Sequence, residues 1–329
     1  MRFINFIYKN FIKLGFISAL LVSFGANSET IIISNEGSDN ITIIDLKTYE
    51  VIATIDSGNR PRDMHYVANS NSLLVAASED DTINIIDMNT YEIIGNLETG
   101  DDPEIFDISP NGKIAVVSNE DDNAATVIDV NTGKIIRVIE DVGIEPEGVN
   151  FSPDGKLVYI TSEGTNTVLI IDPWAGKVIE EVLVGNRPRR GAFTKNGQEY
   201  WVTNELGGTV SVIDTNSFKV IHNIKFEKKG IRSTEITPVD FAMSNDGSLA
   251  YITLGRSKHV AVVQTENYEV IDYILAGSRV WGAAISSDDK TLIVTNGNSD
   301  DISIIDTDKR ASIKSIAVGR TPHTVRIID

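Results

Sequence analysis

The sequence predicts an all-β fold, a seven-bladed β-propeller of four-stranded antiparallel blades, on three observations. A unit of about 42 residues recurs seven times, each unit contains four short strand-like segments, and the chain ends are out of phase with the unit. The clearest marker is an Ile-Ile-Asp or Val-Ile-Asp triplet whose successive spacings are 42, 42, 43, 42, 50 and 42 residues. Such a period, built from short strands, is typical of radial repeats. The marker positions are Asp45, Asp87, Asp129, Asp172, Asp214, Gln264 and Asp306.

Residues 145–186 show how one unit becomes a blade. The turn Ser152-Pro153-Asp154-Gly155-Lys156 combines a proline that fixes φ with a glycine that accepts positive φ. Aspartates such as Asp45 and Asp214, which end the triplets, are expected to accept hydrogen bonds from main-chain groups two residues further on. A parallel solenoid is the alternative architecture, and the regular hairpin units argue against it. Strands are predicted at 147–151, 157–161, 167–171 and 177–183.

The two chain ends predict how the ring closes. After residue 28 the chain begins with what corresponds to a second strand, Ile31 to Ser34, followed by Ile41–Ile44 and Val51–Ile55. It ends with Thr324–Ile328, a first strand that has no hairpin partner. We therefore expect the C-terminal strand to complete the N-terminal blade as its innermost strand, which removes two open sheet edges.

The N-terminus is typical of a secretory signal. Arg2, Lys9 and Lys13 precede and flank a short apolar core at 14–24, and Ala26-Asn27-Ser28 offers small residues for cleavage. We expect a signal peptide at 1–28 and a single propeller domain at 29–329; an uncleaved anchor is the alternative. The chain has no cysteine, which excludes disulfides, c-type haem attachment and thiolate metal sites. We expect the protein in the periplasm.

The charge of the chain bears on its partners. It has 29 basic and 47 acidic residues, and loss of the three basic residues of the signal would change the net charge from −18 to −21. Nucleic-acid affinity depends mainly on neutralising phosphates, so no nucleic-acid partner is expected. No other segment is long and apolar enough to span a bilayer. We expect no membrane contact after removal of the signal, and a monomer.

Two kinds of loop meet at one end of a propeller, and both carry charge. The loop between the second and third strands repeats a glutamate eight or nine residues before the triplet aspartate. The last two blades have Gly255 and Gly297 there, and Arg256, Lys258 and His259 flank this gap. The five glutamates are Glu36, Glu79, Glu120, Glu163 and Glu205.

The loops between blades carry a second set of in-phase residues. Four positions after the loop glycine lie Arg62, Glu104, Glu147, Arg189, Trp281 and His323, and two positions after it lie Arg60, Asp102, Glu145, Arg187 and Arg279. One interpretation is an Arg–Glu lattice that stabilises the scaffold. The other is an ion-paired axial mouth that binds a polar small molecule or a partner protein. Clustered carboxylates need arginines or a cation, so a divalent metal such as Ca²⁺ or Mg²⁺ stays open.

The fifth interval is eight residues longer than its neighbours because of the segment from Lys225 to Pro238. Arg232 and Glu235 in this segment are placed to lean over the mouth as a lid, although a tolerated surface insertion is at least as compatible with the sequence. Trp281 is either a stacking platform for a ligand or a packing residue of its strand.

The chain resembles known propeller families. Tyr159-Ile160-Thr161-Ser162 and Tyr200-Trp201-Val202-Thr203-Asn204 resemble the strand signature of YVTN repeats. A closer resemblance covers almost the whole exported chain and concerns the PQQ-dependent catabolism-associated β-propeller proteins. The ordered fragments that carry it include Asp101-Asp102-Pro103-Glu104, Glu145-Pro146-Glu147-Gly148, Arg187-Pro188-Arg189 and Gly277-Ser278-Arg279-Val280-Trp281.

This resemblance implies a periplasmic accessory of quinoprotein alcohol oxidation, with a quinoprotein dehydrogenase or cytochrome component as partner. It does not imply a bound cofactor, and neither PQQ nor haem is expected. Quinoprotein dehydrogenases resemble eight-bladed propellers with a vicinal disulfide, whereas this chain has seven units. None of its histidines, which are His65, His222, His259 and His323, has a clear haem-ligand context.

Two functions follow from the sequence. The first is a non-enzymatic binding or scaffold module that uses the charged mouth, because no nucleophile–base motif, histidine-rich metal motif or phosphate loop is present. The alternative is a lactonase-like or other hydrolase at the same mouth, in which Glu104, Glu147 and Glu205 act as bases or as ligands of a divalent cation.

Overall fold

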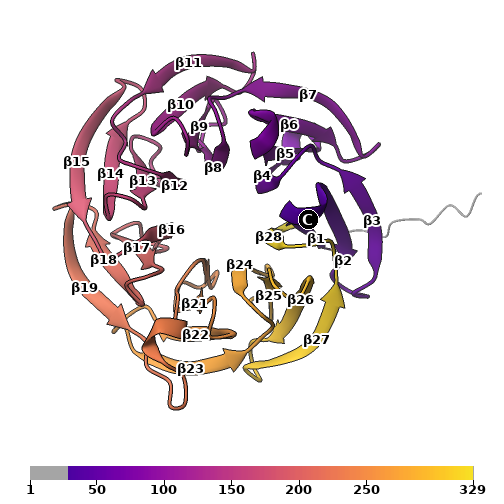
Figure 1. Ribbon diagram of the computed structural model, residues 1–329, viewed down its shortest axis with the longest axis vertical. Helices are drawn as coiled ribbons and strands as arrows, with labels where there is room; N and C mark the ends of the chain where they lie inside the picture. The colour runs from indigo at the N-terminus through magenta and orange to yellow at the C-terminus, as the bar shows by residue number, and fades with distance from the viewer. Residues whose placement is uncertain (1–28, 329) are drawn as a thin grey trace, which may run out of the picture.

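The computed structural model describes residues 29–328 and shows seven four-stranded antiparallel sheets arranged around one axis (Figure 1). Blade 1 contains β1 (Thr30–Asn35), β2 (Asn40–Asp45), β3 (Val51–Asp56) and β28 (Pro322–Ile328). Blade 2 contains β4 (Pro61–Val67), β5 (Ser72–Ala77), β6 (Thr82–Asp87) and β7 (Glu92–Glu98). Blade 3 contains β8 (Pro103–Ile108), β9 (Ile114–Asn119), β10 (Ala124–Asp129) and β11 (Lys134–Ile139). The predicted fold class is confirmed.

The remaining blades repeat the same order from the axis outward. Blade 4 contains β12 (Pro146–Phe151), β13 (Val158–Ser162), β14 (Thr167–Asp172) and β15 (Lys177–Leu183). Blade 5 contains β16 (Pro188–Phe193), β17 (Glu199–Asn204), β18 (Thr209–Asp214) and β19 (Lys219–Lys225). Blade 6 contains β20 (Phe241–Met243), β21 (Leu249–Thr253), β22 (His259–Gln264) and β23 (Val270–Leu275). Blade 7 contains β24 (Val280–Ile285), β25 (Thr291–Asn296), β26 (Asp301–Asp306) and β27 (Ala311–Ala317).

Blade 1 is completed by the C-terminal strand. β28 pairs antiparallel with β1, with Ile32 opposite Arg326 and Ile33 opposite Val325. The predicted closure is therefore confirmed, and the ring is closed by main-chain hydrogen bonds between the two ends of the domain. A closed ring leaves only the short outer edges of the blades unpaired.

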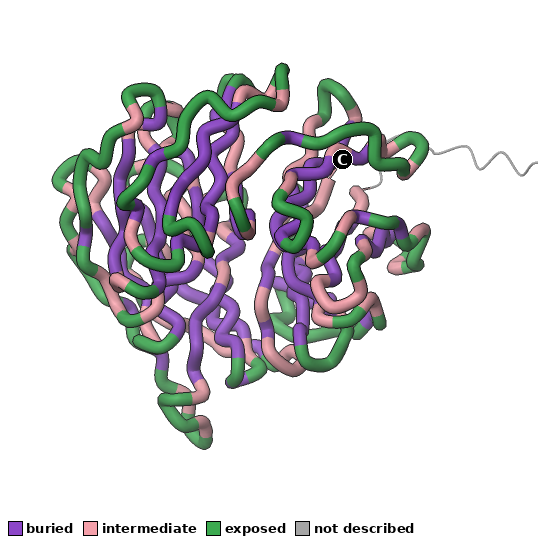
Figure 2. The backbone as a smooth tube through the Cα atoms, turned by 45° about the horizontal axis from the view of Figure 1, so that its top comes forward, coloured by how far each residue is buried: buried purple, intermediate pink, exposed green. Residues whose placement is uncertain are grey.

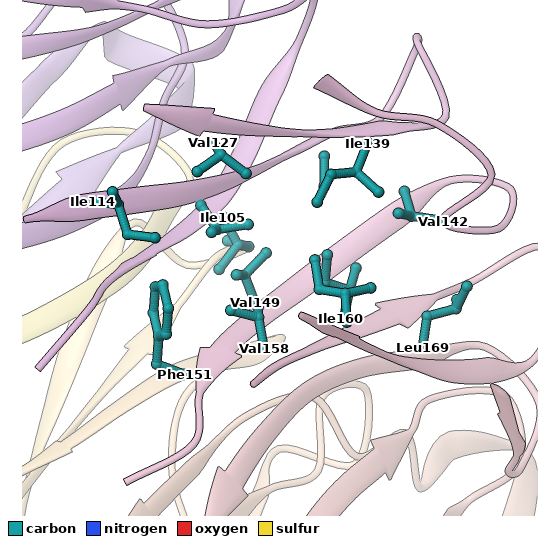
Figure 3. Packing of buried hydrophobic residues seen from close by; sticks show 13 residues of the cluster. Ile105, Ile114, Val127, Ile139, Val142, Val149, Phe151, Val158, Ile160 and Leu169 are labelled. Carbon is teal, nitrogen blue, oxygen red and sulfur yellow. The ribbon is translucent and has the colours of Figure 1, made fainter. Parts of the chain in front are cut away.

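The core lies between neighbouring blades. The second and third strands are sandwiched on both faces and are therefore almost continuously apolar, as in β5, where all six residues are buried. Figure 3 shows one such interface, where Ile105 and Val127 of blade 3 pack with Val149 and Ile160 of blade 4. The outer strands are mostly exposed, which the green perimeter in Figure 2 makes visible.

The loops follow the predicted turn chemistry. Asp45 Oδ1 accepts the main-chain N–H of Thr48 at 2.6 Å, and Asp214 Oδ1 accepts that of Ser217 at 2.8 Å. Four single-turn 3₁₀ helices also occur in the described chain, η1 (Glu36–Ser38), η2 (Ala68–Ser70), η3 (Ser78–Asp80) and η4 (Ser233–Glu235). The triplet aspartates therefore organise turns, as the sequence predicts, but at Asp45 and Asp214 these donors lie three residues further on rather than the two expected.

The insertion before β20 packs on blades 5 and 6. Phe226 and Ile236 are buried in the cluster that also contains Trp201 and Ile252. The segment is therefore anchored by apolar burial at both of its ends.

The predicted signal peptide at 1–28 lies outside the described residues. Between residues 29 and 328, no helix has both the length and the apolar character that crossing a bilayer requires.

Candidate functional site

The loops between blades place their charged side chains at the axis through an unusual backbone conformation. Arg60, Asp102, Glu145, Arg187 and Arg279 all have positive φ, between 47° and 62°. This conformation is uncommon for residues other than glycine and marks positions where the surrounding structure imposes the geometry. These five residues form the rim of the mouth, and none of them is a glycine, although a glycine stands two positions before each.

The main-chain N–H of several rim residues donates a hydrogen bond to a polar side chain of the preceding blade. Asn123 Oδ1 accepts the N–H of Glu145 at 2.9 Å, and Asn166 Oδ1 accepts that of Arg187 at 2.8 Å. These asparagines also have positive φ. The rim is therefore positioned by a repeated side-chain to main-chain hydrogen bond between adjacent blades, a device that the sequence analysis missed although Asp or Asn recurs at these positions.

Blades 1 to 3 contribute the first half of the ion-pair network. Arg60 lies 3.2 Å from Glu36, 3.1 Å from Asp102 and 3.4 Å from Glu104. Arg62 lies 3.0 Å from Glu36 and contacts Glu104 directly. Each arginine thus bridges the glutamate of its preceding loop to acidic residues of the next blade.

Blades 4, 5 and 7 contribute the second half. Arg187 lies 2.6 Å from Glu163 and 3.6 Å from Glu205, and Arg279 lies 3.1 Å from the same Glu205. Arg189 contacts Glu163 and lies 3.0 Å from Glu147. Because Glu147 is also 4.0 Å from Arg62, the two halves form one network.

The two in-phase sets differ in depth. The set that includes Arg62, Glu104, Glu147, Arg189 and His323 is buried, with exposed fractions of 0 to 7%. It forms the floor of the mouth, whereas the side chains of Arg60 and Arg187 on the rim are 30% and 39% exposed. A ligand in the mouth would therefore contact the rim side chains first, and the buried floor side chains would influence it mainly by positioning the rim.

Polar atoms without ordinary hydrogen-bond partners gather at this floor. Among the described residues, eight buried side-chain polar atoms have no such partner, and seven of them belong to the mouth. Three of these atoms, both carboxylate oxygens of Glu104 and Oε1 of Glu147, lie in the ion pairs with Arg60, Arg62 and Arg189. The four that remain still mark the mouth as a candidate site, because native structures contain few such groups. The seven atoms of the mouth belong to Glu36, Arg62, Glu104, Glu147, Arg189 and Trp281, and the eighth belongs to Asn35.

The floor carboxylates titrate differently from one another. Burial raises the pKa of Glu104 to about 8, with Glu147 and Glu120 adding to this and Arg62 opposing it. Burial and the charge of Glu147 also raise the pKa of Glu120. Burial opposes the ionisation of Glu147 as well, but Arg189, Arg190 and Arg62 outweigh it and lower that pKa. The Glu104–Glu120 pair therefore tends to keep a proton, while Glu147 stays ionised.

One group of carboxylates could hold a metal. Oxygen atoms of Asp102, Glu104 and Glu120 lie within 4.8 Å of one another, which suits Ca²⁺ or Mg²⁺ by ligand type. Arg60 contacts Asp102 and Arg62 contacts Glu104, so the two arginines already compensate the negative charge that a cation would otherwise neutralise. The donor set is therefore better satisfied by arginines and a shared proton than by a divalent ion.

Trp281 lies at the opposite side of the mouth. The guanidinium of Arg279 lies 5.1 Å above its ring, and the His323 ring packs edge-on against it at 5.1 Å. Its indole N–H is buried and has no hydrogen-bond partner in the described part of the chain. Burial and the neighbouring arginines lower the pKa of His323 well below its ordinary value, so this histidine is neutral. Trp281 therefore combines an aromatic face with a buried donor that has no partner among the described residues.

Three predicted residues stay outside this network. Glu79 is exposed and makes no ion pair among the described residues; it lies eight rather than nine residues before its triplet aspartate, and Ser78 occupies the in-phase position. Arg232 and Glu235 pair with each other at 2.7 Å, 80% and 39% exposed. The structure shows no contact of this pair with the mouth, because neighbouring charges three residues apart satisfy each other.

Comparison with known proteins defines the class of this chain. Residues 145–317, slightly more than half of the chain, match the family described as lactonase, 7-bladed β-propeller, and residues 60–190 match the YNCE-like β-propeller family. The protein is thus a seven-bladed propeller with an ion-paired axial mouth. It belongs to the seven-bladed β-propeller lactonase family.

Solved structures share this fold at low identity. The periplasmic gluconolactonase PpgL of Pseudomonas aeruginosa is 16% identical with a TM-score of 0.77, covering 92% of this chain and 99% of that one. A candidate 6-phosphogluconolactonase of Bacteroides fragilis is 20% identical with a TM-score of 0.79, covering 93% and 99%. A chain of Kuenenia stuttgartiensis hydrazine synthase is 22% identical with a TM-score of 0.76, covering 84% and 92%. No curated protein matches the sequence.

Proposed function

We propose that this protein hydrolyses a polar lactone at the axial mouth, which was the alternative rather than the leading sequence-based hypothesis. The observation that carries the proposal is the Glu104–Glu120 pair, two carboxyls with raised pKa beside the rim arginine Arg60. Groups whose environments shift their pKa toward neutrality are suited to acid–base chemistry. Membership of the lactonase family and the gluconolactonase name of PpgL support the substrate class.

The two sides of the mouth suit different parts of such a substrate. On the side of blades 5 and 7, Arg187 and Arg279 share Glu205, and each keeps guanidinium N–H groups that make no ion pair within the described structure. These guanidinium groups would bind the hydroxyl or anionic substituents of the lactone, and the ring of Trp281 lies beside Arg279 as an apolar face. On the side of blades 2 and 3, the acidic pair would face the ester carbonyl.

Hydrolysis then needs one general base that activates water and one hydrogen-bond donor that stabilises the carbonyl oxygen. Glu120 takes a proton from water as the water oxygen bonds to the carbonyl carbon, and Arg60 stabilises the negative charge on the carbonyl oxygen. The bond from the carbonyl carbon to the ring oxygen breaks, and Glu120 returns the proton to that oxygen, which gives a hydroxy acid. Glu104 is a positioning residue, since it is fully buried and hydrogen-bonds Glu120 only when one of the two carboxyls is protonated.

Hydrolysis of glucono-δ-lactone and of its 6-phosphate by the purified protein tests the proposal. Replacing Glu120 with Gln should lower kcat by about 100-fold or more, because the base is lost. Replacing Glu79 with Gln is the matched control, since it removes a carboxylate of the same loop position that lies outside the network. Turnover of neither lactone, or equal turnover by the Glu120→Gln variant, would contradict the proposed reaction.

A second candidate is the non-enzymatic accessory of quinoprotein oxidation in the periplasm. The observation in its favour is that the partly exposed rim arginines Arg60 and Arg187 are held by carboxylates on two sides, which gives a rigid charged surface. Capture of a quinoprotein dehydrogenase or its cytochrome by the immobilised protein tests it. Replacing Arg60, Arg187 and Arg279 on the rim with Ala should abolish capture, and unchanged capture would remove this candidate.

A further inference from the structure

A second polar cavity lies further along the axis than the floor of the mouth. It has a volume of about 180 Å³ and is lined by the inner strands of six blades. Its charged and polar lining residues come one to three positions later in these strands than the floor residues. At about 3.3 Å per residue, the cavity therefore lies up to roughly 10 Å beyond the floor.

The cavity opens away from the mouth. The floor side chains of Glu104, Glu147 and Arg189 are 0%, 2% and 9% exposed, so the ion-pair network closes the axis. Further along the strands exposure rises again, to 25% for His65 and 32% for Arg326. Solvent therefore reaches this cavity from the opposite end of the propeller, and its ligand need not pass the mouth.

Part of the lining is already satisfied. Arg326 lies 2.5 Å from Asp63 and also donates to the carbonyl of Met64 at 2.9 Å. Asp63 further accepts the N–H of Phe106 at 3.3 Å and lies 3.5 Å from His65. The charges of Arg326 and Asp63 therefore compensate each other, and their contacts link blades 1, 2 and 3.

Three lining residues on consecutive blades keep unused binding capacity. Among the described residues, Asp107 of blade 3 accepts hydrogen bonds only from the main-chain N–H groups of Ile108 and Phe151, and burial raises its pKa. Asn150 of blade 4 accepts the Tyr200 hydroxyl at 2.9 Å through Oδ1, which leaves its amide N–H₂ free within the described structure. The nearest carboxylate to Arg190 of blade 5 is Glu147 at 3.7 Å, and no hydrogen bond of its guanidinium is found there either. Its charge also acts on Asp63 and on the buried Asp240 of the same lining, without a direct ion pair to either.

These three groups form an ordered arc. β8, β12 and β16 are neighbours around the axis, so an acceptor carboxylate, an amide donor and a guanidinium follow one another along one wall (Figure 1). The cavity has room for about six water molecules, which limits a ligand to a few heavy atoms. A carboxylate without a nearby hydrogen-bonded cation favours an ammonium group, and a free guanidinium favours a carboxylate.

We propose that this cavity binds a small α-amino acid as a zwitterion, with its ammonium group on Asp107 and its carboxylate on Arg190 and the Asn150 amide. The ligand is neutral overall, so it satisfies both charges without adding one to the site. The proposal is independent of catalysis at the mouth, because the two sites share no residue and open at opposite ends.

Calorimetric titration of the purified protein with glycine, L-alanine, L-serine and L-aspartate tests the site. At least one of them should bind. For L-alanine, two matched probes then separate the contacts: L-lactate replaces the ammonium by a hydroxyl, and ethylamine lacks the carboxylate. Each should bind at least about tenfold more weakly than the amino acid, since each loses one charge-assisted contact. For another amino acid that binds, its own hydroxy-acid and amine analogues serve in the same way.

Variants assign the two ends of the ligand. Asp107→Asn should reduce affinity for the amino acid about tenfold or more and leave lactate binding unchanged. Arg190→Gln should also reduce affinity for the amino acid about tenfold or more, and should leave ethylamine binding unchanged. Glu79→Gln, whose exposed side chain lies outside both sites, is the control and should change neither. No binding of any of the four amino acids overturns the proposal, as does equal affinity for the hydroxy acid. This comparison uses the unaltered protein, so it decides even if a variant fails to fold.

Discussion

Asp39 Oδ1 accepts the main-chain N–H of Arg60 at 2.9 Å, and both residues have positive φ. The same relationship joins Asp81 to Asp102 at 3.0 Å and Asp300 to Thr321 at 2.9 Å. A residue with left-handed backbone in one blade thus fixes a residue with left-handed backbone in the next. The rim of the mouth is held by this contact at positions that are not glycine.

This relationship predicts that Asn166→Ala destabilises the protein by about 2 kcal/mol, because the hydrogen bond to Arg187 is lost and alanine tolerates positive φ poorly. Denaturant unfolding measures this loss. Asn131→Ala is the control, since that side chain is exposed and makes no hydrogen bond in the described chain. Equal stability of the two variants would show that the contact does not position the rim.

The ring closure predicts that deleting Pro322 to Asp329 unfolds or aggregates the protein, because β1 loses its partner and the sheet edge opens. A milder variant, Val325→Ala, should cost about 1–3 kcal/mol, since this side chain is fully buried between blades 7 and 1. Thermal unfolding measures both. Ile313→Ala on the exposed outer strand serves as the control, and a truncated protein that melts near the wild-type temperature would refute closure.

The two types of repeated glutamate predict opposite results. Glu163→Ala leaves Arg187 and Arg189 without their shared carboxylate, and should destabilise the fold by about 3 kcal/mol. Glu79→Ala should change stability by less than about 0.5 kcal/mol, because its side chain is exposed and unpaired in the described structure. Chemical denaturation of both variants is the measurement, and similar losses would mean that the network contributes nothing specific.

The raised pKa of Glu104 predicts a pH dependence of stability. Between its ordinary value of 4.5 and about 8, the folded protein retains a proton that the unfolded chain releases. Stability from this group is therefore fully present below about pH 4.5 and is lost as the pH rises toward 8. Glutamine imitates the protonated form, so the unfolding free energy of Glu104→Gln relative to wild type should increase from pH 5 to pH 8. A difference that stays constant over this range would show that Glu104 is ionised throughout.

Much of the fold was predictable because its signals are local. The triplets, the Pro-Asp-Gly type turns and the apolar second and third strands each report on a few adjacent residues, and a seven-fold repeat multiplies them. The candidate site was predictable only in part. Phase alone placed Glu36, Glu120, Glu163 and Glu205 in the mouth, whereas the slip of one residue at Glu79 was treated as harmless although it turns that side chain outward.

By itself, the sequence determined the number of blades, the closure by the last strand and the end of the propeller where arginines and glutamates meet. Only the tertiary structure decided which of these charges are buried as the floor, which remain open on the rim, and that Arg232 and Glu235 bind each other instead. It also brought Asp107, Asn150 and Arg190 to one wall. The physical reason is that spacing sets the face of a strand, whereas burial and pairing depend on residues of neighbouring blades, which lie more than 20 positions away in the chain.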